Sequence, residues 1–229
     1  MSKTNTEVAI APTTMPAFVS NEAIKGSGAG NENVGAKDLQ IPRLSLLQEL
    51  SPEVNERKPE FIEGAKVGQL LNKMTGELFD QLFVINLKYQ HGYTAWKKRK
   101  LGGGLFGSFN SEEEAVTSLE AEGLDPQHYD IQESPMHFVL LLDENGKPTM
   151  PAIIDMPSTK NKVSRNWNSQ IAAQGDEYDR FAFVWLLGAR MEENNQSQEY
   201  WNYTVKLLGA APTELYDEAK KFYERVKNA

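Results

Sequence analysis

The chain has 229 residues and a formal net charge of −8, with 24 basic side chains, 32 acidic side chains, three histidines and no cysteine. The lack of cysteine excludes disulfides, thiol nucleophiles and thiolate metal sites. The histidines lack the spacing of a metal-binding helix, so we expect no metal and no other cofactor. No apolar run approaches the roughly 20 residues that span a bilayer, and the N-terminus lacks a basic region followed by an apolar one, so we expect a soluble cytoplasmic protein with no membrane partner.

The first part of the chain is poor in side chains that could form a core. Residues 1–37 are rich in Ser, Thr, Asn, Gly and Ala, which predicts a disordered tail. Residues 38–229 are then expected to form a single domain. The leucine-rich segment 39–50 fits neither helical nor strand periodicity, and Pro42 argues against a helix that begins before it. We expect an extended segment there, with room for one helical turn.

The first strong strand pattern follows. Residues 67–73 and 77–96 are predicted to be two strands, rich in branched and aromatic side chains and joined by a turn-like Met-Thr-Gly sequence. Gly92, inside the second strand, predicts a bulge or a close approach of another backbone. Because side chains alternate along an extended chain, one face of this strand should carry three rings: Tyr89, His91 and Tyr93.

The remaining patterns alternate helices with hairpins. The glycine-rich segment 101–107 predicts a mobile loop, and Asn-Gly at 145–146 is a strong hairpin signal. Ser158 or Thr159 is the expected cap of a helix. In chain order, the predicted elements are a helix at 111–122, strands at 138–143 and 150–155, a helix at 158–174, strands at 181–191 and 199–208, and a helix at 213–227. This order indicates an α+β fold dominated by antiparallel hairpins.

The charges are distributed unevenly along the chain. Two windows, residues 81–111 and 156–175, hold 8 of the 24 basic residues and none of the 32 acidic ones, so the rest of the chain has a net charge of −16. Cations follow phosphates while aromatic rings stack on unpaired bases, which is the combination that single-stranded nucleic acid needs. We expect the windows to form two walls of one groove that holds single-stranded DNA. The predicted contacts are Lys88, Lys97, Lys98, Arg99, Lys100, Lys160, Lys162 and Arg165 with phosphates, Tyr89, Tyr93 and Trp96 with bases, and Phe106 as a further aromatic contact.

Each of these features also has a purely structural explanation. The lysine run could guard an edge strand whose rings lie in the core, and the helix of the second window could simply pack on a sheet. The acidic segment 112–133 could be a solvated helix face, a surface that recruits basic partners, or a competitor of DNA for the groove. Trp185 and Trp201, in strongly apolar strands, are expected in the core.

Several short motifs resemble a group of bacteriophage single-stranded DNA-binding and recombination-associated proteins. They are Ile41-Pro42-Arg43-Leu44, Gly68-Gln69-Leu70-Leu71-Asn72 with Thr75-Gly76-Glu77, the 96–104 stretch and Ser164-Arg165-Asn166-Trp167, and the resemblance covers most of residues 39–209. It implies an OB-type β-barrel, DNA coating without sequence readout inside an infected bacterium, and contacts with phage or host replication proteins. Many such proteins end in an acidic tail, whereas residues 216–229 form a charge-balanced segment.

The overall expectation is an α+β protein with an antiparallel OB-like β-barrel decorated by helices, which binds single-stranded DNA and has no catalytic residue. Two other classes stay open. One is an interaction module that uses the acidic segment 112–133, and the other is an enzyme or annealing protein that acts on DNA. Asp143, Asp155 and Asp179 lack the spacing of a two-metal nuclease centre, which argues against hydrolysis. The sequence leaves oligomerisation open.

Overall fold

The computed structural model describes residues 29–30, 32–33, 40–194 and 197–227. The tail predicted at residues 1–37 therefore lies outside the described residues, apart from those two pairs, and stays a prediction. Residues Gln40–Ala229 form one compact unit, to which the following description applies.

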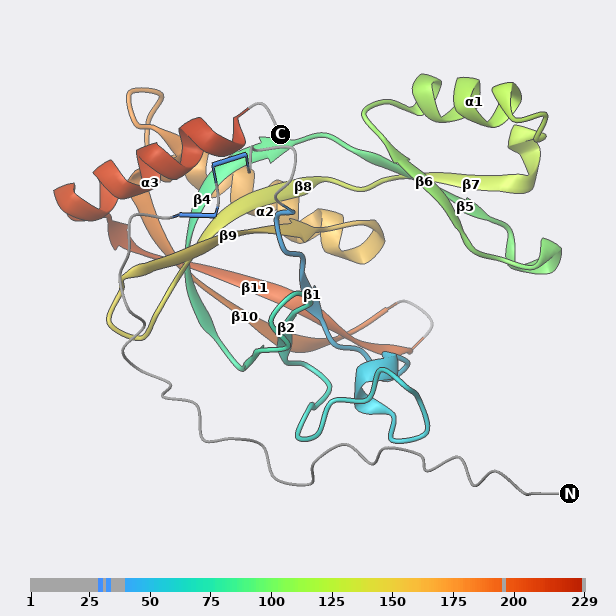
Figure 1. The fold of residues 1–229 in the computed structure, drawn as a ribbon, viewed down its shortest axis with the longest axis horizontal. Coiled ribbons are helices and arrows are strands. Elements are labelled where there is room, and N and C mark those ends of the chain that lie inside the picture. The colour runs from blue at the N-terminus through green and yellow to red at the C-terminus, as the bar shows by residue number, and fades with distance from the viewer. Residues whose placement is uncertain (1–28, 31, 34–39, 195–196, 228–229) are drawn as a thin grey trace, which may run out of the picture. The chain divides into compact units, whose positions relative to one another are not determined.

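The centre of this unit is a five-stranded antiparallel sheet (Figure 1). Its strand order is β11-β10-β4-β8-β9, so the strand that comes first in the chain lies in the middle. Both faces of the sheet are covered, which explains why β4 and β8 are nearly continuous apolar runs rather than alternating ones. The strands are β4 (Leu82–Gln90), β8 (Met136–Leu142), β9 (Pro148–Asp155), β10 (Phe183–Glu193) and β11 (Glu199–Ala210).

Two apolar clusters lie on the two faces of the central sheet. On one face, helix α2 (Asn161–Ala172) contributes the buried Trp167, whose ring meets that of Trp185 edge to face at 5.9 Å. A second sheet, of the short strands β1 (Leu44–Leu46), β2 (Leu70–Asn72) and β3 (Leu78–Phe79), adds leucines to this cluster. On the other face, helix α3 (Thr213–Val226) packs Ala219 and Val226 into the second cluster. The core position expected for Trp185 is confirmed, and Trp201 is partly buried against the same cluster.

A third sheet, referred to below as the small sheet, has the strand order β6-β5-β7 and carries helix α1 (Figure 1). Its strands are β5 (Tyr93–Lys97), β6 (Leu105–Phe109) and β7 (Tyr129–Glu133), and α1 spans Glu112–Ala121. The Oγ of Ser111 accepts a hydrogen bond from the Glu114 N–H at 3.1 Å, so the predicted start of this helix is confirmed. Strand β7 was not predicted, because its alternating Tyr129 and Ile131 lie within the acidic segment.

The long strand predicted at 77–96 is divided into β3, β4 and β5, which belong to three different sheets, and its second interruption lies where the chain leaves the central sheet. Strand β4 ends at Gln90 and β5 begins at Tyr93, and the returning chain passes from β7 to β8 beside it. The Ser134 N–H donates to the Gly92 carbonyl at 2.7 Å. A Cβ on Gly92 would lie 2.8 Å from the Ser134 carbonyl oxygen, which confirms the predicted close approach of a second backbone.

Other predictions were wrong in detail. The segment predicted as a loop at 101–107 is partly a short 3-10 helix at Arg99–Leu101 and partly the start of β6. Helix α2 begins at Asn161 after a 3-10 turn, and neither Ser158 nor Thr159 caps it, because the turn has already set the helical path. The extended segment expected at 39–50 contains β1, in agreement with the prediction.

The described residues thus form a mixed fold of antiparallel sheets with three α-helices, and their sheets do not close into a barrel. The α+β class is confirmed, whereas the OB-like barrel is not, since the strands divide among three separate sheets. Among the described residues, no helix is both long and apolar enough to cross a membrane.

We predict that Gly92→Ala destabilises the protein by about 1 to 3 kcal/mol, because the added methyl group must push the Ser134 carbonyl away and strain the crossing between the sheets. Urea unfolding followed by circular dichroism measures this loss. His91→Ala, at the exposed neighbouring position, is the control and should change the free energy of unfolding much less. An unchanged midpoint in the Gly92 variant would show that the close approach does not constrain the fold.

Candidate nucleic-acid interface

The small sheet has one covered face and one open face. Ala95 is fully buried on the side of α1, so strand alternation places Thr94 and Trp96 on the opposite side. Trp96 is 42% exposed, and its Nε1 donates to the Thr94 Oγ1 at 3.2 Å, which fixes the orientation of the indole ring. We define the open face as the row of cross-strand partners around these two residues: Thr94, Trp96, Leu105, Ser108, Asp130 and Gln132.

Four cations lie at the end of this sheet, in the connection between β5 and β6. We call them the basic tip: Lys97, Lys98, Arg99 and Lys100, all exposed. The turn closes through three glycines at 102–104, whose φ angles of 106°, 68° and 109° favour residues without a Cβ. The Lys97 N–H donates to the Gly104 carbonyl at 2.8 Å, and the Lys98 Nζ donates to the Gln127 carbonyl at 2.7 Å. The basic tip is therefore anchored at its first two residues, Lys97 and Lys98.

A hollow of about 470 Å³ lies where the basic tip meets the open face. It combines an exposed ring, cations, a carboxylate and an amide, which come from the adjacent strands β5 and β7 and from the connection between β5 and β6. Its lining consists of Trp96, Lys97, Arg99, Gly103, Gly104, Asp130 and Gln132. A second hollow, of about 160 Å³, lies at the other end of the sheet and is lined in part by Thr94 and Ser108.

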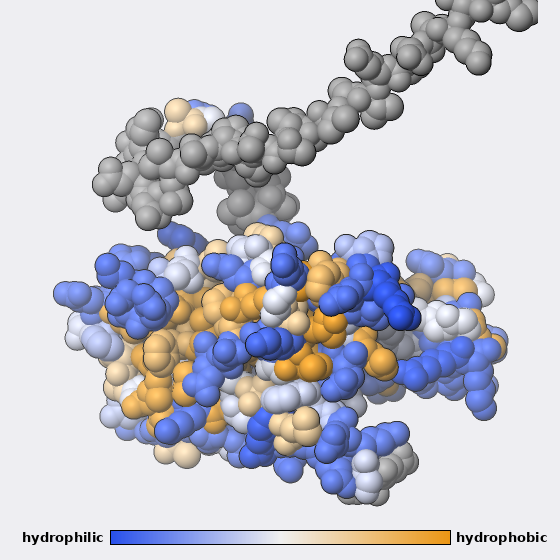
Figure 2. All heavy atoms as spheres, turned by 90° about the horizontal axis from the view of Figure 1, so that it is seen from below, coloured by the Kyte–Doolittle hydropathy of each residue, from blue (hydrophilic) through white to orange (hydrophobic). Residues whose placement is uncertain are grey.

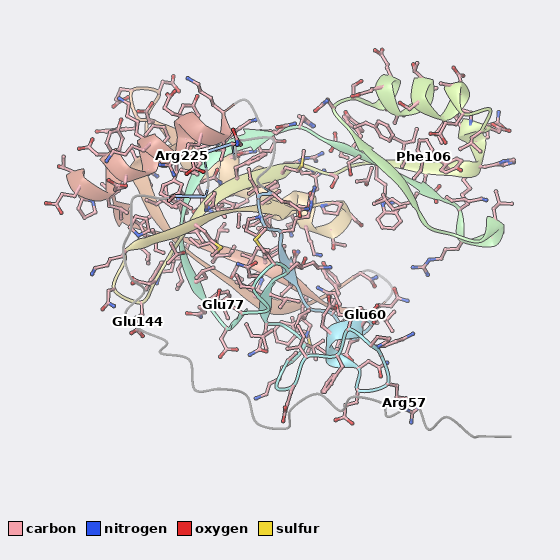
Figure 3. All side chains as sticks on the ribbon, viewed as in Figure 1. Arg57, Glu60, Glu77, Phe106, Glu144 and Arg225 are labelled. Atoms are coloured by element: carbon pink, nitrogen blue, oxygen red, sulfur yellow. The ribbon has the colours of Figure 1, made fainter. Side chains whose placement is uncertain are left out.

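The other predicted aromatic contacts are less accessible than Trp96. Phe106 packs between Phe109 and Tyr129, at ring distances of 5.9 and 5.6 Å, on the side that faces α1 (Figure 3). Tyr89 is partly buried, 5.2 Å from the His137 ring and below the Arg180 guanidinium. The open face does not include Phe106 or Tyr89, because each ring packs against its own neighbours.

Two predicted cations also lie away from the open face. Lys88 belongs to β4, where its Nζ sits 4.8 Å above the Phe138 ring and donates to the Val226 carbonyl at the end of α3. Partial burial lowers the pKa of Lys88. Lys160 lies over the Tyr203 ring at 5.7 Å, and burial lowers its pKa although the charge of Asp155 opposes the shift. The position of Lys88 follows from side-chain alternation along β4, and that of Lys160 follows from the packing around the start of α2.

The second window is linked to the first through Glu133, an acidic residue that belongs to neither window. Lys162 and Arg165 are exposed on α2, and the Arg165 Nη2 donates to the Glu133 Oε2 at 3.2 Å. The Asn161 Nδ2 donates to the same oxygen at 2.6 Å, and these hydrogen bonds lower the pKa of Glu133. Glu133 pairs with Tyr93, four residues before the basic tip, or about 13 Å along the strand. The windows therefore meet at the base of the small sheet and separate towards its tip.

A buried polar cluster supports this base. The His137 Nδ1 lies 2.9 Å from the Asn86 Nδ2, and its Nε2 lies 2.8 Å from the Ser164 Oγ. Because an amide nitrogen only donates, the ring proton lies on Nε2 and is donated to Ser164. The ring stacks on Trp167 at 4.7 Å, so His137 joins β4, β8 and α2. Burial and the nearby Arg180 charge lower the pKa of His137 to about 3. No pattern in the sequence indicated this cluster.

We predict that this histidine makes the protein less stable in mild acid. Between pH 6.5 and about 3 the unfolded chain binds a proton that the folded chain rejects, so the free energy of unfolding falls as the pH falls. Between pH 7.5 and pH 5 the loss from this residue should be roughly 2 kcal/mol. Urea unfolding at both pH values should show a smaller loss in His137→Gln. His128→Gln, at an exposed histidine, should behave like the parent protein. Equal pH dependence in both variants would contradict the assignment.

No group of three or more His, Asp or Glu side chains is placed to hold a metal ion within residues 40–194 and 197–227 or the two described pairs before them. The fold and the open face define an α+β protein that presents an exposed ring and a basic tip on a small sheet.

The chain belongs to the Pam3 phage gp34-like protein family, whose model matches residues 4–229. The phage relationship that the resemblance implied is thereby supported. No curated protein and no solved structure matches the chain.

Proposed function

We propose that this protein binds single-stranded DNA through the open face and the basic tip, without a catalytic step, during phage replication or recombination. The observation that carries the proposal is the exposed Trp96 ring beside the four exposed cations of the basic tip. An OB-type barrel was expected for this class, but the proposal needs only a sheet face with a ring and cations. Contacts with phage or host replication proteins belong to the same proposal.

A flexible DNA strand would gain base stacking and charge neutralisation at this surface. A base that stacks on the Trp96 ring gains about 1 to 3 kcal/mol, whichever base it is, because every base has a π face. The Thr94 hydroxyl holds the indole in place before binding, so little side-chain freedom is lost. The side chains of the basic tip supply charge for the phosphates on either side of the stacked base.

The net charge of −8 does not exclude binding. At physiological ionic strength charges are screened beyond about 8 Å, so the acidic remainder of the chain acts weakly on a strand held at the basic tip. The bound DNA would run from the basic tip across Trp96 and the hydroxyls of Thr94 and Ser108 towards the second hollow. Arg165 and Asn161 bind Glu133 at the same end of the small sheet, but Glu133 pairs with Tyr93 and so lies on the face of Ala95, opposite the open face.

We predict that Trp96→Ala weakens binding of a fluorescein-labelled dT oligonucleotide by about 5-fold to 150-fold, which corresponds to the loss of one stacked base. Fluorescence anisotropy at low salt measures the dissociation constant. Trp96→Phe should retain most of the affinity, because a smaller ring still stacks. Tyr178→Ala removes another exposed ring, outside the small sheet, and should leave the affinity unchanged.

The same titrations separate the competing function classes. If the protein acted only as a partner-binding module through residues 112–133, no variant of Trp96 would change its activity. An absence of oligonucleotide binding at low salt would refute the proposal outright. Annealing activity would appear as faster pairing of complementary strands in the presence of the protein.

We predict that the double substitution Arg99→Ala and Lys100→Ala weakens binding and lowers the salt dependence. Each lost phosphate contact should reduce the slope of log K against log salt by about 0.7, so the pair should reduce it by about 1.4. Titration at four salt concentrations measures the slope. Lys206→Ala with Lys220→Ala removes the same charge from exposed positions on β11 and α3 and should leave the slope unchanged. Equal slopes in both double variants would show that the basic tip does not contact phosphates.

A further inference from the structure

The hollow beside Trp96 contains a carboxylate that a purely non-specific site would not need. Asp130 lies directly opposite Trp96 on the neighbouring strand, so both side chains are on the open face with Cβ atoms about 5 Å apart. It is exposed, and its side chain has no hydrogen bond or ion pair within the part of the chain that the structure describes. Arg99 lines the same hollow, yet these two opposite charges do not pair with each other.

This carboxylate would work against simple phosphate binding. An acidic side chain beside a ring and a cation repels the phosphates on either side of a stacked base. A base edge that donates hydrogen bonds would reverse this effect, because an ionised carboxylate only accepts and has two oxygens side by side. Asp130 is placed to meet such an edge, since a base lying on the indole of Trp96 projects its edge beyond the ring.

The four bases differ in what they present to a carboxylate. Guanine alone has two adjacent donors on its pairing edge, the N1–H and the N2 amino group. On the pairing edge of adenine and of cytosine, one amino donor lies next to an acceptor nitrogen. On that of thymine, the N3–H donor lies between two carbonyl oxygens. Guanine also presents O6 and N7 as acceptors, and these are the atoms that an arginine recognises. Asp130 and Arg99 therefore have complementary preferences for the same base.

We propose that the hollow lined by Trp96, Asp130, Arg99 and Gln132 is a guanine-selective subsite for one nucleotide of a bound strand. The base stacks on Trp96, donates from N1 and N2 to the Asp130 carboxylate, and accepts at O6 or N7 from Arg99. This inference rests on the proposed binding of single-stranded DNA, to which it adds a preference at one position. The rest of the strand is held without readout of its sequence.

The test compares oligonucleotides that differ at one base. The protein is titrated with dT12, with dT12 carrying one central guanine, adenine or cytosine, and with the hypoxanthine analogue, which keeps N1–H but lacks the N2 amino group. We expect the guanine oligonucleotide to bind about fivefold to tenfold more tightly than dT12, as two hydrogen bonds to a partly exposed charged group allow. Hypoxanthine should give an intermediate affinity.

The carboxylate is tested by Asp130→Asn, which should abolish the preference for guanine over thymine. Its matched control is Glu113→Gln, which removes one negative charge from the exposed surface of α1 and should keep the preference. Both variants lower the net negative charge equally, so a general electrostatic gain in affinity would be common to both. Free GMP serves as a further ligand and should bind far more weakly than the guanine oligonucleotide.

The outcomes separate the two proposals. Equal affinity for guanine and thymine oligonucleotides would overturn the subsite and leave the proposed function standing. A preference that persists in Asp130→Asn would overturn it as well, because another group would then read the base. Tight binding of free GMP, equal to that of the oligonucleotide, would overturn the claim that the subsite serves a strand. If no oligonucleotide binds, the proposed function fails and the subsite fails with it.

Discussion

The structure depends on one contact between backbones, the close approach of Gly92 and Ser134 where two strands cross from the central sheet to the small sheet. At this crossing the chain leaves a sheet that is buried on both faces and enters one that is covered by α1 on a single face (Figure 1). A side chain at Gly92 would separate the strands, so the glycine is what allows both to pass. The exposure of Trp96 follows from that exit, because the same alternation in the central sheet would have buried the ring.

The two parts of the chain differ in how their polar groups are satisfied. In the central sheet, His137 is held between Asn86 and Ser164, and burial keeps it neutral. On the open face of the small sheet, Asp130 has no partner within the described residues, and water satisfies it in the free protein. The hydropathy of the surface is mixed, with apolar areas between hydrophilic ones (Figure 2). Particular exposed side chains, such as the Trp96 ring, therefore distinguish the open face better than the extent of apolar surface does.

Charge acts at short range in this protein. Glu133 ties α2 to the end of β7 by accepting from Asn161 and Arg165, so an acidic residue joins the two basic windows. Asp130, three residues earlier, faces the ring at the other end of the same strand. Both belong to a segment that its composition alone would assign to a solvated surface. The acidic residues nearest to the proposed interface thus have specific positions, whereas those on the exposed side of α1 face solvent.

The sequence by itself determined the elements whose signals are local. The Ser111 cap and the glutamates after it predicted α1, Asn-Gly at 145–146 predicted the β8–β9 hairpin, and Gly92 predicted a close backbone approach. It also singled out the cations of the basic tip, because a run of charged side chains is expected at the surface, and the adjacent Trp96. Only the tertiary structure decided which predicted contacts share a surface. Lys88 packs against α3, Lys160 against Tyr203, Tyr89 against His137 and Phe106 against Tyr129, while Asp130 comes to lie beside Trp96. Strand pairing decides the positions of Tyr89 and Asp130, helix and ring packing decide the others, and no local pattern records either the register or the packing partner.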